Sequence, residues 1–187
     1  PIVMRDIVLD GESLKIRDVV ETGLGRTTVH LSNDARKRME ISRLGIDHIL
    51  ESGETTYGIN TGFGALSSVS IESDKLEALQ VNLIRSHACG IGEEMENKHT
   101  LMMMLIRANT LCRGNSGARP LIVDTLISMI NHKICPIIPR IGSLGASGDL
   151  APLSHLAMGM MGEGFCNIMN EDGNWIKMPA LDALKKY

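Results

Sequence analysis

The chain has 187 residues, of which 43% are hydrophobic and 22% are charged, so it is long enough to form one globular domain with a sizeable core. Its formal net charge of −3 lacks the basic excess by which proteins bind nucleic acid or an acidic membrane surface, and we expect neither partner. The longest apolar run, 101–106, is far too short to cross a bilayer, and no signal-peptide pattern opens the sequence. We therefore expect a cytoplasmic protein.

Residue usage indicates a helical core and argues against a metal site. Methionine occurs 12 times whereas aromatic residues make up only 3%, and flexible thioether side chains fill irregular gaps between helices. The six histidines form no His-x-x-x-His or His-Glu-x-x-His pair, so we expect no metal. The cysteines are far apart and form no Cys-x-x-Cys pair, which predicts four reduced, buried thiols: Cys89, Cys112, Cys135 and Cys166.

The predicted elements are mainly helices. Near the N-terminus, the Asp10-Gly11 pair between two apolar runs predicts a β-hairpin over 7–16. Apolar spacings of three and four residues, with glycine or proline at the boundaries, then predict five helices. They cover about 32–53, 73–87, 98–112, 120–135 and 149–161. A second hairpin follows over 165–178, around Asp172-Gly173. Because no repeat or linker interrupts the pattern, residues 1–187 are expected to form one mainly α domain with short hairpins near both ends.

Residues 142–155, GSLGASGDLAPLSH, place an Ala-Ser-Gly tripeptide directly before the helix predicted from Asp149. A phosphate-binding loop needs Lys-Ser or Lys-Thr after its last glycine, whereas the carboxylate of Asp149 would repel phosphate. A nucleophile elbow, Gly-x-Ser-x-Gly, needs a second glycine at 149 and a preceding strand. Neither site is therefore predicted, and an ordinary loop before a capped helix is the simplest alternative.

The tripeptide Ala146-Ser147-Gly148 permits a reaction of the backbone with itself. Because glycine has no Cβ, the nitrogen of Gly148 can approach the carbonyl carbon of Ala146 closely, and attack there with loss of water closes a five-membered ring. Loss of a second water from Ser147 leaves an exocyclic methylene. The positive end of the following helix favours negative charge on this ring. The product is an electrophile, 4-methylidene-imidazol-5-one (MIO), made without an external cofactor.

All fourteen residues of 142–155 resemble the signature of the aromatic amino acid lyase family, which contains histidine, phenylalanine and tyrosine ammonia-lyases and related aminomutases. Residues 57–64, YGINTGFG, resemble the tyrosine loop of the family, and 82–90, NLIRSHACG, resemble its substrate-pocket helix. The segments 107–111 and 114–117 follow the family pattern as well. The resemblance implies the MIO-bearing N-terminal domain of the fumarase- and aspartase-like helical superfamily.

The resemblance also implies two roles for the loop 57–64. A tyrosine flanked by glycines often only anchors a turn, but in this family the tyrosine of the loop removes the β-proton of the substrate. Tyr57 is therefore the expected base, and Ala146, Ser147 and Gly148 are the other expected catalytic residues. Gly64 is expected to let the backbone approach the substrate.

His87 bears on the choice of substrate. A histidine near a helix C-terminus can simply interact with the helix dipole. In the family, however, Ser-His at this place is similar to histidine ammonia-lyases, where the ring contacts the substrate imidazole, whereas phenylalanine-specific relatives carry apolar residues. Some tyrosine-specific lyases and aminomutases also have a histidine here. His87 is therefore expected to bind a polar aromatic substrate, and the Ile59-Asn60 pair favours histidine.

The implied activity is the deamination of L-histidine to trans-urocanate and ammonia. Tyrosine or phenylalanine ammonia-lyase and aromatic 2,3-aminomutase activities remain alternatives, as does a non-catalytic helical fragment. Family members are much longer, and their later helices supply further substrate contacts and build a homotetramer. We therefore expect this chain to act with such a C-terminal part and to be inactive alone.

The remaining candidate side chains are interpreted as structural. Cys89, Cys112 and the methionines of 102–104 are expected in the core. His155 follows Ser154 in the helix after the tripeptide and is expected to be a packed or hydrogen-bonded histidine that takes no part in catalysis.

Overall fold

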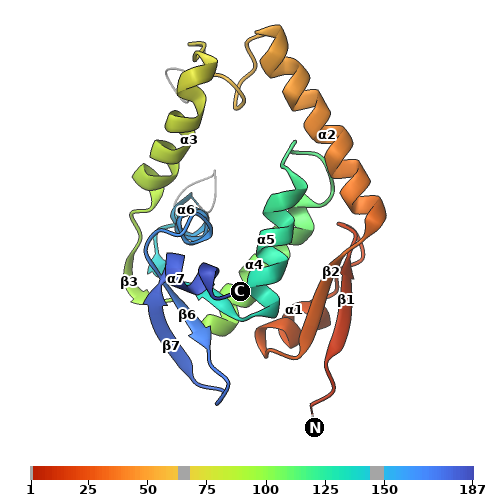
Figure 1. Ribbon diagram of the computed structural model, residues 1–187, viewed down its shortest axis with the longest axis vertical. Coiled ribbons are helices and arrows are strands. Elements are labelled where there is room, and N and C mark those ends of the chain that lie inside the picture. The colour runs from red at the N-terminus through yellow and green to blue at the C-terminus, as the bar shows by residue number, and fades with distance from the viewer. Residues whose placement is uncertain (1, 63–67, 144–149) are drawn as a thin grey trace.

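The computed structural model describes residues 2–62, 68–143 and 150–187 (Figure 1). The tripeptide 146–148 and Gly64 lie outside these described residues. In chain order the elements are β1 (Arg5–Leu9), α1 (Ile16–Gly23), β2 (Thr27–Leu31), α2 (Asn33–Ser52), α3 (Ser73–His87), β3 (Ile91–Glu94), α4 (Asn97–Leu111), α5 (Pro120–Asn131), β4 (Ile134–Pro136), β5 (Pro139–Ile141), α6 (Leu150–Met160), β6 (Phe165–Met169), β7 (Trp175–Pro179) and α7 (Ala180–Lys185).

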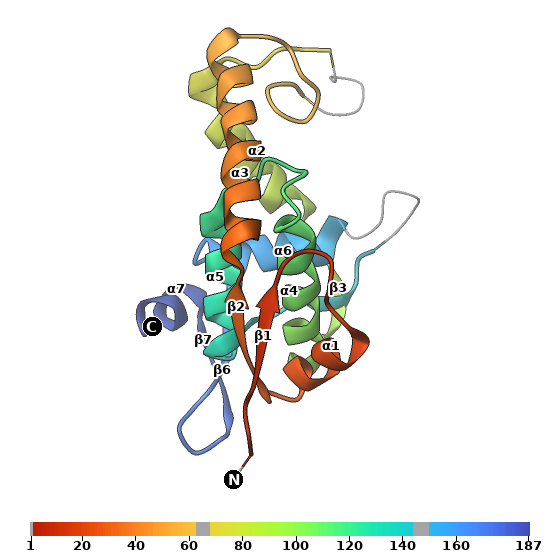
Figure 2. The same cartoon turned by 90° about the vertical axis from the view of Figure 1, so that its right-hand side faces the viewer.

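The core lies around the pair of helices α4 and α5. Met104 and Leu105 of α4 and Val123 and Leu126 of α5 are fully buried, so the two helices pack through aliphatic side chains and a thioether. The parallel pair β1–β2 with α1 covers one side of this helix pair, and the sheet β4–β6–β7 with α7 lies on the other (Figures 1 and 2). The prediction of a mainly α fold is confirmed.

The predicted N-terminal hairpin over 7–16 is wrong. The Asp10-Gly11 turn does form, since the Asp10 carboxylate accepts from the backbone N–H groups of Glu12 and Ser13. The chain then enters helix α1, whose first turn is capped by the Asp18 carboxylate accepting from Lys15 N at 2.9 Å. Because α1 carries the chain back to its starting edge, β2 pairs parallel with β1, from Arg5↔Thr27 to Leu9↔Leu31.

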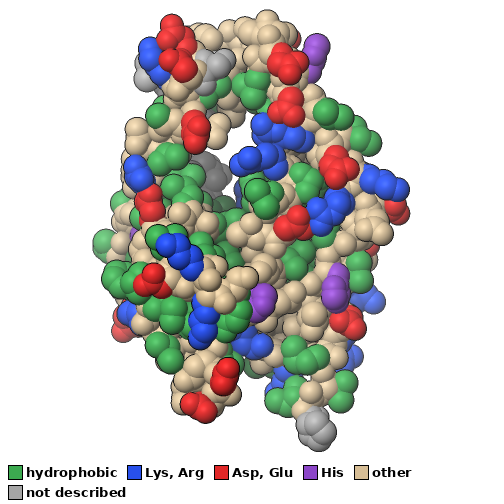
Figure 3. Space-filling model, in the orientation of Figure 1, with side chains coloured by type: hydrophobic (Ala, Val, Ile, Leu, Met, Phe, Trp, Pro, Cys, Tyr) green, Lys and Arg blue, Asp and Glu red, His purple; other side chains and the backbone are tan. Residues whose placement is uncertain are grey.

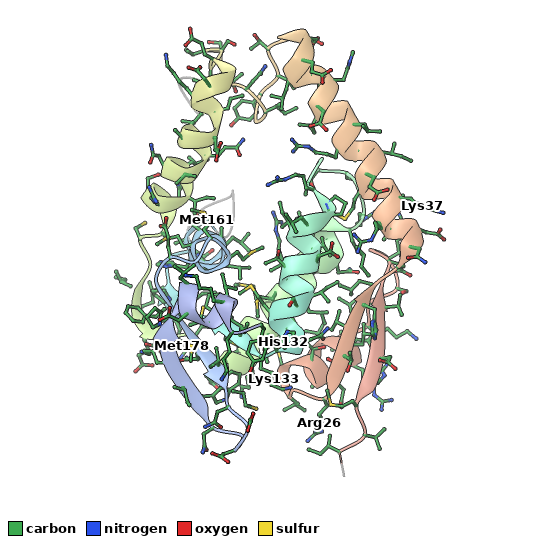
Figure 4. The ribbon with its side chains drawn as sticks, viewed as in Figure 1. Arg26, Lys37, His132, Lys133, Met161 and Met178 are labelled. Carbon is green, nitrogen blue, oxygen red and sulfur yellow. The ribbon has the colours of Figure 1, made fainter. Side chains whose placement is uncertain are left out.

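The Asn131 side chain joins this N-terminal unit to the helical core. Its Oδ1 accepts from Val29 N at 2.8 Å and its Nδ2 donates to Val29 O at 2.9 Å, as a neighbouring strand would. Asn131 is the last residue of α5, which ends earlier than the predicted 135. His132 and Lys133 follow at the base of the molecule, near Arg26 (Figure 4), and Lys133 has a φ of +53°. The left-handed residue turns the chain into β4.

The C-terminal hairpin is confirmed. β6 and β7 pair antiparallel from Phe165↔Pro179 to Met169↔Trp175, around a turn that contains Gly173 at a φ of +80°. The short strand β4 pairs with the other edge of β6, and β3 pairs with β5. The strand pair β3–β5 matters for the site because it lies between α3 and α6 in the chain.

Helices α2 and α3 extend away from the core and lean together at their far ends (Figure 1), which leaves an opening between them (Figure 3). A cavity of about 570 Å³ lies there, lined by side chains of both helices and by residues 116–119. In α2, Ala35 and Met39 of the first turns are the buried residues. No helix among the described residues is long and apolar enough to span a membrane.

Candidate active site

The tyrosine loop is held in shape by its own polar side chains. Asn60 is 5% exposed, and its amide accepts from Thr56 N at 2.8 Å and donates to Glu54 O at 2.7 Å. The Asn60 carbonyl in turn accepts from Ile71 N at 2.9 Å, which ties the two ends of the loop together. The motif asparagine therefore builds the loop, and its side chain is occupied by these backbone contacts.

Tyr57 stands at the start of this loop and is 63% exposed. The next residue, Gly58, has a φ of +80°, a conformation that side-chain-bearing residues rarely adopt, so the motif needs glycine there. Gly58, Ile59 and Thr61 share a cavity of about 260 Å³ with α3 residues from Leu76 to Ile84. The fold thus lays the tyrosine loop along the helix that ends in His87.

His87 is the last residue of α3, and its ring is oriented by its own helix. Nδ1 lies 2.8 Å from the carbonyl oxygen of Leu83 and 3.1 Å from Oγ of Ser86. Because a carbonyl oxygen can only accept, Nδ1 carries the proton in this arrangement, which leaves the Nε2 lone pair as an acceptor. The ring can therefore accept a hydrogen bond from an N–H or O–H group.

The segment after His87 contacts α6. The backbone N–H of Gly90 donates to Nε2 of His155 at 3.1 Å, and burial lowers the pKa of His155. The expectation that His155 is hydrogen-bonded is confirmed. A Cβ on Gly90 would lie 3.1 Å from Pro139 Cβ and 3.3 Å from Ile141 O, so the strand pair β3–β5 also closes on this glycine.

Gly142, on the N-terminal side of the tripeptide, approaches both Gly90 and Ala151. A Cβ on Gly142 would lie 2.7 Å from Ala151 Cβ and 3.1 Å from Gly90 Cα, so glycine is required at 142. Helix α6 begins at Leu150, and the N-terminal end of a helix carries a partial positive charge. The tripeptide 146–148 therefore stands in the chain immediately before a positive helix end.

The described residues place the loop that contains Tyr57 against α3, the helix that ends in His87, and place α6 beside the end of α3. Among the residues interpreted as structural, Cys112 is buried as predicted. The prediction for Cys89 is wrong: this residue lies two positions beyond the last residue of α3, His87, and its thiol is exposed. Motif comparison drew attention to neither the loop-building role of Asn60 nor the close contact of Gly142, although both lie inside the quoted motifs. Within the described residues, no group of three or more His, Cys, Asp or Glu side chains is placed to hold a metal ion.

The sequence profile of the aromatic amino acid lyase family matches residues 14–187, which is nearly the whole chain. The chain belongs to the aromatic amino acid lyase family. Its fold agrees with this assignment: it has a TM-score of 0.86 to a crystal structure of histidine ammonia-lyase from Trypanosoma cruzi, at 38% identity over 98% of this chain and 34% of that one.

Two further relatives define the range of the family. A histidine ammonia-lyase of Staphylococcus saprophyticus is 50% identical over 156 residues, which cover 83% of this chain and 31% of the relative. The crystal structure of tyrosine aminomutase from Streptomyces globisporus matches with a TM-score of 0.84 and 31% identity, over 97% of this chain and 33% of that one. The chain thus spans about a third of the length of the relatives it matches.

Proposed function

We propose that residues 1–187 form the catalytic-loop domain of a longer ammonia-lyase that converts L-histidine to trans-urocanate and ammonia. The observation that carries the proposal is the 50% identity with a relative named histidine ammonia-lyase. Among the solved structures, identity to histidine ammonia-lyase, 38%, likewise exceeds the 31% identity to tyrosine aminomutase. Because the chain spans only a third of these relatives, the activity is proposed for the complete protein.

In this proposal Ala146, Ser147 and Gly148 cyclise to MIO. Attack of the Gly148 nitrogen on the Ala146 carbonyl carbon releases one water, and loss of the Ser147 hydroxyl with its α-hydrogen releases a second. The flanking residues fit such a group, since Gly142 lies close to Ala151 and the positive end of a helix, α6, follows the tripeptide in the chain. When formed, the group supplies an electrophilic methylene that makes the substrate amine a better leaving group.

The other residues of the chain bind the substrate and move the proton. Tyr57 takes a proton from the β-carbon of the substrate while ammonia leaves the α-carbon, which forms the double bond of urocanate. Nε2 of His87 accepts a hydrogen bond from the imidazole N–H of the substrate, because its Nδ1 is occupied by Leu83 O. Gly64 lets the loop backbone approach the substrate.

A second candidate is action on tyrosine, as an ammonia-lyase or a 2,3-aminomutase. The same Nε2 of His87 accepts equally well from a phenol O–H, and a tyrosine aminomutase is among the structural neighbours. Phenylalanine offers no donor to His87 and is the least favoured substrate.

We further propose that the complete protein is a cytoplasmic homotetramer. The support from the chain is the apolar surface on α2, where Ile41 is 70% and Leu44 is 66% exposed. Exposed apolar side chains three positions apart lie on the same face of a helix, and such a face is typical of a surface that another helix covers.

The test uses the complete protein. Its intact mass should be two waters below the sequence mass, and it should absorb in the near ultraviolet and release urocanate from L-histidine. Ser147→Ala should abolish all three signals while the far-ultraviolet circular dichroism stays unchanged. Ser143→Ala, a change at an exposed serine just outside the tripeptide, is the matched control and should retain them. Full turnover by the Ser147→Ala variant, or an unmodified mass in active protein, would refute the proposal.

A further inference from the structure

Gly90 is the point at which α3, the strand pair β3–β5 and α6 meet. Its N–H donates to Nε2 of His155 at 3.1 Å across 65 residues of sequence. The next residue, Ile91, pairs with Ile141 of β5. Gly142, which follows β5, also lies close to the Cα of Gly90. A single backbone position therefore receives contacts from both sides of the segment that precedes α6.

The link between Gly90 and His87 is short and folded. The Cys89 N–H donates to the His87 carbonyl at 2.9 Å, and Ala88 has φ −79° and ψ 61°, which are the dihedral angles of an inverse γ-turn. The Ala88 N–H also remains bonded to Ile84 O at 3.1 Å. Because these bonds leave little freedom between the two residues, displacement of Gly90 moves His87.

We infer that His155 is a positioning residue: its imidazole holds Gly90 on α6 and thereby sets where the His87 ring lies relative to α6. The contact needs a neutral acceptor at the Nε2 position, because the group it binds is a backbone donor. It also needs glycine at 90, since a Cβ there would lie 3.2 Å from Nε2 of His155. The role of His87 in this inference rests on the function proposed above.

Removing the acceptor should lower the activity of the complete enzyme without preventing formation of the ring. We expect His155→Leu to lower kcat/KM for L-histidine about tenfold, which is the scale of one lost hydrogen bond with its donor left unpaired. His155→Gln keeps an acceptor oxygen near the Nε2 position and should stay within about threefold of the wild type. His99→Leu, at an exposed histidine of α4, is the matched control and should have no effect.

The intact mass separates positioning from maturation. His155→Leu should still lose two waters, because the change leaves the tripeptide and its flanking glycine in place. If the variant loses activity in proportion to a loss of MIO, His155 acts on MIO formation, and the inference would be overturned. Equal activities of His155→Leu and His155→Gln would overturn it as well. If His155→Leu does not fold, His155→Ala takes its place.

A double-mutant cycle tests whether His155 acts through His87. If it does, His155→Leu should lower kcat/KM for L-histidine less than about twofold in a His87→Phe background, because the imidazole that it positions is absent. Additive losses would show that His155 stabilises the protein by another route and would overturn the inference.

Hydrogen exchange decides the contact independently of any activity. The Gly90 amide should be protected in the wild type and in His155→Gln, and should exchange at least tenfold faster in His155→Leu. Unchanged exchange would overturn the inference even in an active enzyme. A wild-type protein that releases no urocanate would instead overturn the proposed function, and the exchange result would still stand.

Discussion

At the scale of single residues, three polar side chains of the candidate site differ in how many of their polar atoms bind the backbone. Asn60 uses both ends of its amide on the loop backbone, whereas His87 uses only Nδ1 on Leu83 O and keeps Nε2 as an acceptor. His155 uses Nε2 on Gly90. Of these three side chains, His87 is therefore the one that we propose to bind the substrate.

Replacing His87 with Phe should change substrate preference in the complete enzyme. We expect kcat/KM for L-histidine to fall about 10- to 100-fold, because the substrate N–H loses its acceptor in a partly apolar site. Relative use of L-phenylalanine should rise. Steady-state kinetics with both amino acids checks this, and an unchanged ratio would show that His87 is only a residue of the helix end.

Replacing Tyr57 with Phe should affect chemistry more than binding. The change deletes the proton acceptor but little volume, so we expect kcat to fall by about 10²- to 10⁴-fold with KM nearly unchanged. The near-ultraviolet absorbance of the ring should persist, which separates the base from ring formation. If kcat is intact, another group removes the proton.

At the scale of elements, side chains join the N-terminal unit and α2 to the helical core. Asn131, at the end of α5, bonds both polar groups of Val29 and so extends the parallel pair β1–β2 by one peptide-like partner. Arg36 of α2 and Asp124 of α5 form a second link, with two N–H···O contacts of 3.0 and 2.6 Å. These links fix the N-terminal unit and the base of α2 on the helical core.

The first of these links predicts a stability change. Asn131→Leu leaves the N–H and C=O of Val29 without partners, so we expect unfolding to become easier by about 2–4 kcal/mol. Asn131→Asp keeps the acceptor and should cost less. Denaturant unfolding measures both, and Asn115→Leu, at an exposed asparagine, is the control that should change little. Equal stabilities of Asn131→Leu and the control would show that the link contributes nothing.

At the scale of the whole molecule, the site is open. The 260 Å³ cavity beside the tyrosine loop is lined by described residues without lysine or arginine, whereas the 570 Å³ cavity between α2 and α3 is lined in part by Arg43 and Arg119. Beyond Met39, helix α2 has no fully buried side chain, although Gly117 N donates to Ser42 Oγ at 3.1 Å. Isolated helical turns without a packed face are marginal in water.

The open cavities and the exposed apolar side chains of α2 predict how the 187 residues behave when they are purified alone. We expect no urocanate from L-histidine, because the chain spans only about a third of the length of its relatives, and we expect self-association through Ile41, Leu44 and their neighbours. Light scattering and the urocanate assay check both expectations. Turnover by a monodisperse monomer of this length would contradict them.

The sequence alone determined the five longer helices, the C-terminal hairpin and the residues to examine for chemistry, but it predicted neither α1 nor α7. Helix α3 matches its predicted range, and α2, α4 and α6 differ by a residue or so, because apolar periodicity and glycine or aspartate signals are local and act within a few residues. The same local evidence misread 7–16 as a hairpin, since Asp10-Gly11 specifies a turn but not the direction in which the chain continues.

Only the tertiary structure decided which of these residues meet. The bond from Gly90 to His155, the approach of Gly142 to both Gly90 and Ala151, and the pairing of Asn131 with Val29 join positions far apart in the chain. No local pattern encodes such contacts, because they depend on how the strand pair β3–β5 and the helices pack as a whole. The motifs therefore indicate the chemistry, whereas only the tertiary structure shows that Gly90, three residues after His87, is held against α6 and β5.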